Sequence, residues 1–163
     1  MSEECVFKCL CCELVNSQDR TDHFSQRPVS LVQKLRAQGY KGFIYVYNIM
    51  VLFVFYCHVK VKHKGTYVSM LSYFEVPENL EEISPHVAAL WKRYLEEDDK
   101  FRNDRLKMIA RCPTGPWFVR KLIGNVPTII GHKLPQYTYR GEGYCEQMID
   151  VTADKFISNV SDM

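Results

Sequence analysis

The cysteines are the residues of this chain that could act as nucleophiles, and two of them come with a candidate base. The sequence holds seven cysteines and five histidines. Cys112 or Cys145 could pair with His132, since an imidazole activates a thiol by accepting its proton. However, Cys112 directly precedes a proline, and Cys145 falls in a segment typical of a strand. Neither position resembles a known nucleophile turn, so the sequence favours a protein that is not an enzyme.

Four cysteines lie among the first twelve residues: Cys5, Cys9, Cys11 and Cys12. Their spacing lacks the paired knuckles of a zinc site, so we expect no metal there. S-acylation of Cys9, Cys11 and Cys12 is a second interpretation, because apolar residues flank them near a terminus. We favour free thiols in a poorly ordered segment, residues 1–24. The start of the chain has no secretory leader pattern, so an odd cysteine count indicates reduced thiols and a cytoplasmic protein.

Four adjacent carboxylates occupy positions 96–99. Hard cations prefer oxygen ligands, but this run lacks the alternating ligands and the glycine of a calcium loop. We therefore interpret it as a solvated acidic bend, partly neutralised by Arg102 and Arg105. The sequence predicts no metal and no cofactor.

Aromatic and basic residues offer a candidate binding surface around Trp117. Arg120 and Lys121 follow this tryptophan by one helical turn. An aromatic ring at a membrane interface beside two cations would suit anionic lipid head groups. The alternative is that Trp117 belongs to the core and that the two cations are only solvated.

A second candidate binding surface lies further along the chain. It would be a pocket for a lipid with a polar end, lined by Tyr137, Tyr139, Arg140 and Tyr144. Residues 140–143, Arg-Gly-Glu-Gly, predict a tight turn between two strands. Gly141→Ala should then destabilise the protein through the turn and not through lost chemistry.

The composition predicts one globular domain that could position these residues. Hydrophobic residues make up 47% of the chain and charged residues 25%, with a net charge of +2. This balance gives no case for nucleic-acid binding. The pattern around Trp117 predicts a helix over 115–123 that ends at Gly124. Strands are predicted over 126–130, 136–140 and 144–151.

The first two thirds of the chain predict further elements of both kinds. Apolar spacing predicts a helix over 29–38, capped by Ser25 or Ser30 and stopped by Gly39. Alternation predicts a strand over 66–76. Ser84 and Pro85 predict the start of an amphipathic helix, and 106–111 return to the sheet as a strand.

Residues 42–59 form an apolar run without formal charge. This run is at the lower limit of the roughly 20 residues that a membrane-spanning helix needs. Its β-branched and aromatic residues favour buried strands, and residues 59–64 alternate as an edge strand does. A single-span membrane protein through 42–59 remains the alternative.

Two sequence blocks resemble one known family. The first block is GPWFVRKLIGN-P-IIGHKL with the later Y-RGEGY and IDV, and the second, which lies upstream, is EEDDKFRNDRLKMIAR. They are similar to the C-terminal domain of the Enhanced Disease Resistance proteins. In its larger members this domain follows a pleckstrin-homology and a lipid-transfer domain. The resemblance implies a lipid-binding, membrane-associated regulator, and it carries over no catalytic residue.

The same resemblance sets the expected domain. Residues 25–163 would form about two thirds of it, with an atypical insertion at about 52–65, and strand edges left open could let the chain self-associate. We expect an α+β fold, a curved and mostly antiparallel sheet with a few helices packed on one face. The expected function is a non-enzymatic lipid-binding or membrane-associated module. A protein-interaction or scaffold fragment with no ligand is the rival.

Overall fold

A computed structural model describes residues 5–53, 66–108 and 127–152 of the chain. The described elements, in chain order, are β1 (Lys8–Ser17), the 3-10 helix η1 (Phe24–Gln26), α1 (Leu31–Ala37), β2 (Phe43–Phe53), β3 (Thr66–Val76), α2 (Leu80–Ile83), α3 (Pro85–Glu96), α4 (Asp99–Asn103), β4 (Lys107–Met108), β5 (Thr128–Ile129), η2 (Ile130–His132), β6 (Gln136–Gly141) and β7 (Tyr144–Asp150).

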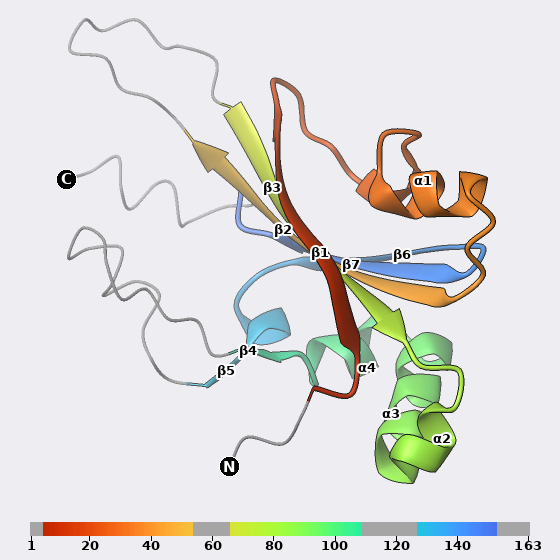
Figure 1. Cartoon of the computed structure of the whole chain (residues 1–163). Coiled ribbons are helices and arrows are strands. Elements are labelled where there is room, and N and C mark those ends of the chain that lie inside the picture. The colour runs from red at the N-terminus through yellow and green to blue at the C-terminus, as the bar shows by residue number, and fades with distance from the viewer. Residues whose placement is uncertain (1–4, 54–65, 109–126, 153–163) are drawn as a thin grey trace, which may run out of the picture.

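Five of the strands form one sheet in the order β1-β3-β2-β7-β6. Only the β2–β7 pair within this sheet is parallel, and its other neighbours pair antiparallel. The predicted α+β class with a mostly antiparallel sheet is therefore confirmed. The helices differ from the expectation of one covered face. Figure 1 shows α1 well apart from α2 and α3, and their contacts fall on opposite faces of the sheet.

The register of β2 and β3 defines these two faces. Ile44, Val46 and Met50 of β2 are fully buried, and they share a face with the β3 residues opposite them, including Tyr73. We call this the α1 face, because Val32 of α1 packs there. The residues between them point to the other side, which we call the α3 face.

The apolar run forms a strand where the structure describes it. Phe43–Phe53 are β2, so the preference for a buried strand over a spanning helix is confirmed for these residues. No helix within 5–53, 66–108 and 127–152 combines the length and apolar character needed to cross a bilayer. The supposed insertion and the alternating segment fall largely outside the described residues.

The expectation of a poorly ordered segment over residues 1–24 is wrong for β1. Lys8–Ser17 pair with β3 along nearly its whole length, and β1 is an edge strand of the sheet. Val15 and Cys11 pack against the core of the α1 face. The reason is a bulge between Cys9 and Cys11, which adjusts the register so that Cys11 and Val15 face inward while Leu14 faces outward.

The helix predicted over 29–38 is α1, slightly shorter than expected. The Ser30 hydroxyl accepts a hydrogen bond from the Gln33 amide, so Ser30 is the cap. Gly39 ends the helix with a φ of 83°. Arg36 then donates to the carbonyls of Tyr40, Gly42 and Gly143, which ties the end of α1 to the β6–β7 hairpin.

Two buried carboxylates join the N-terminal loop to β7. Glu146 is fully buried and accepts from the amides of Phe24 and Ser25, at 3.2 and 2.7 Å, and from Asn48 Nδ2 at 2.9 Å. Asp150 accepts from Arg20 at 2.5 Å. Buried polar groups with these partners are satisfied without water, so they fix the path of the loop over the α1 face.

The predicted strands 136–140 and 144–151 are confirmed as β6 and β7, joined by a tight turn. Gly143 has a φ of 70°, which only glycine adopts without strain. Gly141 lacks such a backbone angle; a Cβ there would lie 2.2 Å from the Tyr144 ring. Gly141 is therefore required by packing and not by turn geometry.

Strands are expected over 106–111 and 126–130. Within the described residues these strands are two residues long each, β4 and β5, and they pair with each other. After Ile129 the chain turns into η2 instead of continuing as a strand. The helix predicted over 115–123 lies outside the described residues.

Candidate functional site

Six aromatic rings gather on the α3 face, and they come from three strands or their ends and from one helix. Their centroid separations run from 5.2 Å for Phe7–Trp91 to 6.5 Å for Tyr45–Phe74, mostly in edge-to-face geometry. The members are Phe7, Phe43, Tyr45, Phe74, Trp91 and Tyr94. The rings do not fill the space between sheet and helix completely.

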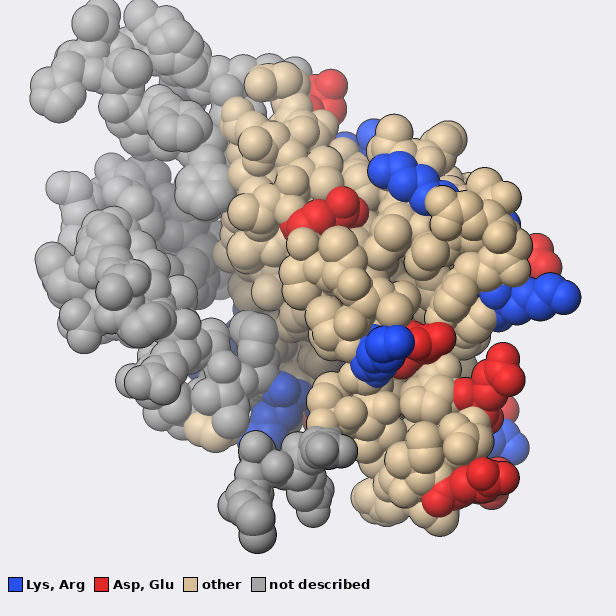
Figure 2. Space-filling model, in the orientation of Figure 1, with Lys and Arg blue, Asp and Glu red and all other residues tan. Residues whose placement is uncertain are grey.

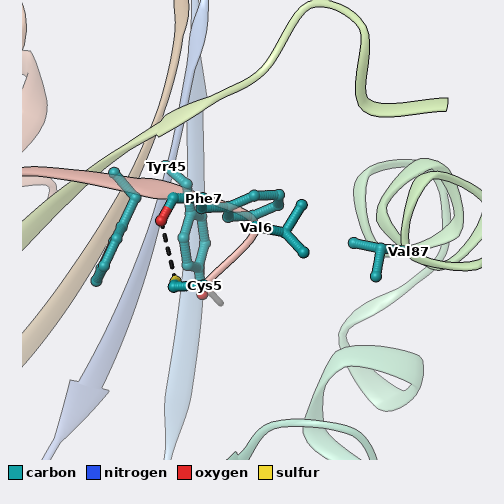
Figure 3. A pocket seen from close by; sticks show the side chains of 6 residues that line it. Cys5, Val6, Phe7, Tyr45 and Val87 are labelled. Atoms are coloured by element: carbon teal, nitrogen blue, oxygen red, sulfur yellow. Dashed lines mark hydrogen bonds between the residues drawn. The ribbon is translucent and has the colours of Figure 1, made fainter. Parts of the chain in front are cut away.

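A cavity of about 300 Å³ lies beside these rings. Its lining is almost wholly apolar and comprises Cys5, Val6, Phe7, Tyr45, Phe74 and Val87. Figure 3 shows Val6 and Val87 pointing toward each other, with the rings of Phe7 and Tyr45 on the sheet side. The Cys5 thiol donates to the Phe7 carbonyl at 3.0 Å. The cavity is open to solvent, and its volume falls at the lower end of the range for ligand pockets.

Beneath the rings lies a layer of polar side chains that are bonded to one another. Gln147 Oε1 accepts from the hydroxyls of Tyr94 at 2.6 Å and Thr138 at 2.9 Å, and its amide donates to Gln136 at 3.0 Å. Burial raises the pKa of Tyr94 and of Tyr45 well above the usual range. These hydroxyls therefore remain protonated and act as hydrogen-bond donors.

The helix α3 is positioned by its two ends. Pro85 occupies the first turn as predicted, but the Ser84 side chain makes no capping hydrogen bond. At the other end the buried Arg102 donates to the carbonyls of Tyr94, at 2.9 Å, and Leu95, at 3.4 Å. It also pairs with Asp99 at 2.9 Å. The predicted acidic bend is thus a joint that Arg102 holds against α3.

Charged side chains are scattered over the surface in Figure 2, with acidic ones gathered over α2 and α3. Glu81 and Glu82 of α2 are exposed and contribute to them. The lining of the cavity, in contrast, is almost wholly apolar. The geometry suits an uncharged, apolar group.

The residues predicted to bind lipid are not brought together. Trp117, Arg120 and Lys121 lie outside the described residues. Tyr139 and Arg140 are neighbours on β6, so their side chains lie on opposite faces of the sheet. Tyr139 stacks on His23 with centroids 4.8 Å apart, whereas Arg140 is exposed on the α3 face.

The other two tyrosines of the predicted pocket, Tyr137 and Tyr144, share the α1 face with Tyr139. Tyr144 is buried and bonds to His23 Nε2 at 2.8 Å, whereas Tyr137 is exposed beneath the Arg20 guanidinium, 5.8 Å away. The four predicted residues therefore do not line one pocket. Period-two alternation along 136–140 already carried this information.

The candidate acylation sites occupy β1. Cys9 and Cys12 are exposed, whereas Cys11 is half-buried against the core of the α1 face. The hydrogen bond with Cys12 raises the pKa of Cys9. Within the described residues, no group of three or more histidine, cysteine or acidic side chains is placed to hold a metal ion.

The candidate catalytic cysteines can be located in part. Cys145 is fully buried in β7, and burial raises the pKa of its thiol to about 11. His132 Nε2 bonds to Asp104 at 2.8 Å on the surface. A buried thiol with a raised pKa is a poor nucleophile. Cys112 lies outside the described residues.

The aromatic cavity was missed by sequence reasoning, although a signal for it existed. Trp91 and Tyr94 belong to the amphipathic helix predicted after Ser84 and Pro85, and Tyr45 and Phe74 fall in segments predicted as strands. Aromatics at alternate positions of two strands, facing an aromatic helix, indicate a contact between these elements. Neither pattern predicts that the packing leaves a cavity.

Comparisons with known proteins agree on one relationship. The chain matches the family described as Protein ENHANCED DISEASE RESISTANCE 2, C-terminal, over residues 1–163. It is 34% identical over 96 residues to a protein of Arabidopsis thaliana named "Protein ENHANCED DISEASE RESISTANCE 2-like". The match covers 59% of this chain and 12% of that relative's length. No solved structure matches.

Proposed function

Because the chain belongs to the family of Enhanced Disease Resistance 2 C-terminal domains, we propose that it is a non-enzymatic, lipid-binding regulatory module that acts at the periphery of membranes in the cytoplasm. In this proposal the α3 face takes up an acyl chain and leaves it chemically unchanged. The buried Cys145 thiol, with its raised pKa, supports a role without catalysis.

The observation that carries the proposal is the cavity between Val6, Phe7, Tyr45 and Val87. Apolar lining, aromatic walls and an opening to solvent are the features of sites that bind apolar ligands. Burial of apolar surface stabilises by about 25 cal/mol per Å². An acyl chain that replaced solvent there would gain this free energy without needing a charged partner.

Head-group contacts are assigned to a different part of the chain. The cavity lining is almost wholly apolar and offers no charged side chain to an anionic group. We assign anionic head groups to Trp117, Arg120 and Lys121, where two cations follow an aromatic residue. Tyr139 and Arg140 would contribute singly, since they lie on opposite faces.

Trp91 fluorescence tests the cavity directly. The chain has two tryptophans, so a Trp117→Phe background leaves only the emission of Trp91, whose ring lies 5.2 Å from Phe7. Vesicles of phosphatidylcholine should shift this emission to shorter wavelength in a saturable way. Val87→Phe, which fills the cavity, should weaken the response about tenfold or more, since 1.4 kcal/mol corresponds to tenfold.

Leu90→Phe is the matched control for this experiment, because Leu90 lies on the same helix and is 42% exposed. It should leave the titration unchanged. Equal responses from the Val87 and Leu90 variants, or no response from the parent chain, would contradict the proposed cavity function.

Co-sedimentation tests the proposed head-group contacts separately. Arg120→Glu with Lys121→Glu should abolish the extra binding that phosphatidylserine adds to phosphatidylcholine vesicles, and this difference should shrink at high salt. The Trp91 response to phosphatidylcholine alone should persist. A charge-reversed chain that still binds phosphatidylserine vesicles as the parent does would remove these residues from the site.

S-acylation remains part of the proposal for the exposed thiols. Cys9 and Cys12 are exposed on an edge strand, whereas Cys11 is half-buried, so we assign an acyl group to one of the first two. Hydroxylamine-sensitive labelling of the expressed protein should disappear in Cys9→Ser with Cys12→Ser and persist in Cys11→Ser. Labelling that is lost only with Cys11 would contradict this assignment.

One observation favours the rival, a protein-interaction fragment. Leu14 of the edge strand β1 is 70% exposed, and Met70 opposite it on β3 is 38% exposed. Apolar residues at an open strand edge favour pairing with another chain. Sedimentation at increasing concentration should show self-association that Leu14→Lys removes. A monomer at every concentration would argue against this rival.

A further inference from the structure

Two cysteine thiols of β1 are close neighbours on the protein surface. Cys9 Sγ lies 3.8 Å from Cys12 Sγ, and both residues are exposed. Cys12 Sγ also lies 3.5 Å from the Ser72 hydroxyl on β3. Residues three apart in a regular strand point to opposite faces, so this proximity needs an explanation.

The β-bulge supplies that explanation. Cys9 pairs with Phe74 and Cys11 with Tyr73, which leaves Leu10 as the extra residue. Cys12 then pairs with Ser72, so Cys9 and Cys12 face the same side two β3 positions apart. Cys11 faces the opposite side and packs against the core.

This arrangement is close to what a disulfide requires. A sulfur–sulfur bond is about 2.05 Å long and joins residues whose Cα atoms are roughly 4.4–6.8 Å apart. The two sulfurs must approach by rotation of exposed side chains on β1, which is the edge strand of the sheet that the described residues form.

We propose that Cys9 and Cys12 form a reversible disulfide within β1, which makes this bulge a thiol-oxidation site. The oxidant is of the hydroperoxide class. One thiolate attacks hydrogen peroxide, so that an S–O bond forms, the O–O bond breaks, and hydroxide leaves and takes up a proton as water. The second sulfur then attacks the sulfenic sulfur, forming the S–S bond and expelling a second water.

The balance of the reaction is two thiols and one peroxide to one disulfide and two waters. The sulfurs lose two electrons together and the peroxide gains them. A disulfide that is exposed and spans a short stretch of strand is readily attacked by an external thiol. Reduction by a dithiol therefore restores the two cysteines.

Mass spectrometry of the purified chain tests the proposal. The reduced protein is treated with hydrogen peroxide, its remaining thiols are blocked with N-ethylmaleimide, and the peptides are analysed without reduction. We expect two of the seven cysteines to escape labelling, an internal Cys9–Cys12 link, and recovery of both labels after dithiothreitol. Both cysteines still labelled after peroxide would overturn the proposal.

Three single variants separate this link from other pairings. Cys9→Ser should leave Cys12 as a sulfenic acid that a dimedone probe captures, with no internal link. Cys11→Ser, on the opposite face, and Cys5→Ser, near the cavity, should each preserve the Cys9–Cys12 link. A link that joins Cys9 to Cys5 or Cys11, or that joins two copies of the chain, would also overturn the proposal.

Discussion

The two faces of the five-stranded sheet share the same strands but pack in different ways. On the α1 face, the helix and the N-terminal loop cover a core of Val32, Ile44, Val46 and Leu71, all at 1% exposure or less. On the α3 face, aromatic rings meet edge to face and leave a cavity of about 300 Å³. The α1 face is therefore closely packed, which we call the closed face, and the α3 face retains a cavity.

Polar groups show the same contrast. On the α1 face, one side chain, Glu146, accepts the hydrogen bonds of the Phe24 and Ser25 amides. On the α3 face, Gln147 Oε1 has two hydroxyl donors, Tyr94 and Thr138. The carboxylate of Glu146 fixes the path of the chain, whereas Gln147 Oε1 keeps one hydrogen-bond donor if the other is removed. The α1 face should therefore be sensitive to substitution, and the α3 face tolerant of it.

The largest effect is expected for Glu146→Ala on the α1 face. This change leaves two backbone amides and the Asn48 side chain without an acceptor in the core. Each such loss costs about 1–3 kcal/mol, so the free energy of unfolding should fall by about 4 kcal/mol. Urea denaturation followed by circular dichroism measures it.

Glu146→Gln is the control, because it keeps one oxygen acceptor and nearly the same volume. It should lose less than half as much stability. A Glu146→Ala chain within about 1 kcal/mol of the parent would show that the closed face does not depend on this carboxylate.

Gly143→Ala should have the second largest effect, again through the α1 face. The added Cβ would be held at a φ of 70° and would lie 2.3 Å from Arg36 Nη2. Left-handed strain of about 1–2 kcal/mol adds to the displacement of Arg36 from the carbonyls that it binds. We expect a loss of about 3 kcal/mol by thermal denaturation; an unchanged melting temperature would refute this role of the turn.

Most of the sheet could be predicted from the sequence, because its signals are local. The strand Thr66–Val76 has the predicted bounds, and β6 and β7 nearly do. The cap of α1 is Ser30, one of the two serines predicted for it. Period-two alternation, a capping serine and a stop glycine each determine the conformation of residues only a few positions away. These elements need no knowledge of their partners.

The candidate site could not be predicted in the same way, because it depends on pairing. The cavity exists where Phe7, Tyr45 and Val87 meet, and these residues are more than thirty positions apart. The order β1-β3-β2 and the register between these strands decide which aromatics become neighbours on one face. The β1 segment was missed for a related reason: one extra residue at Leu10 breaks its alternation, and the cysteines around it suggested chemistry instead of a strand.

Asp150→Asn should show how much one buried charge on the α1 face contributes to the stability of the protein. Burial raises the pKa of Asp150, but hydrogen bonds from Thr152 and Arg20 outweigh it, so the pKa is lowered below 3.8. A lowered folded pKa contributes stability that is present above pH 3.8 and lost as the pH falls through the folded value. The parent should therefore lose stability below about pH 4 more steeply than the variant.

At neutral pH the same variant should be about 2 kcal/mol less stable, since hydrogen bonds to charged groups contribute about 1.5–3 kcal/mol. Urea denaturation at several pH values measures both effects. Asp104→Asn is the matched control, because Asp104 also has a lowered pKa but is exposed beside His132. Parallel acid profiles for the parent and Asp150→Asn would contradict the assignment.

Tyr94→Phe, on the α3 face, should have the smallest effect, about 1 kcal/mol. Gln147 Oε1 loses one hydroxyl donor and keeps the other, Thr138, at 2.9 Å. Thr138→Val alone should cost as little. The double variant removes both donors and leaves a buried acceptor unsatisfied, so its loss should exceed the sum of the single losses by about 1 kcal/mol in a double-mutant cycle. Strictly additive losses of stability would mean that the two hydroxyls do not substitute for each other at this acceptor. The α3 face would then be as sensitive to the loss of a single hydrogen bond as the α1 face is.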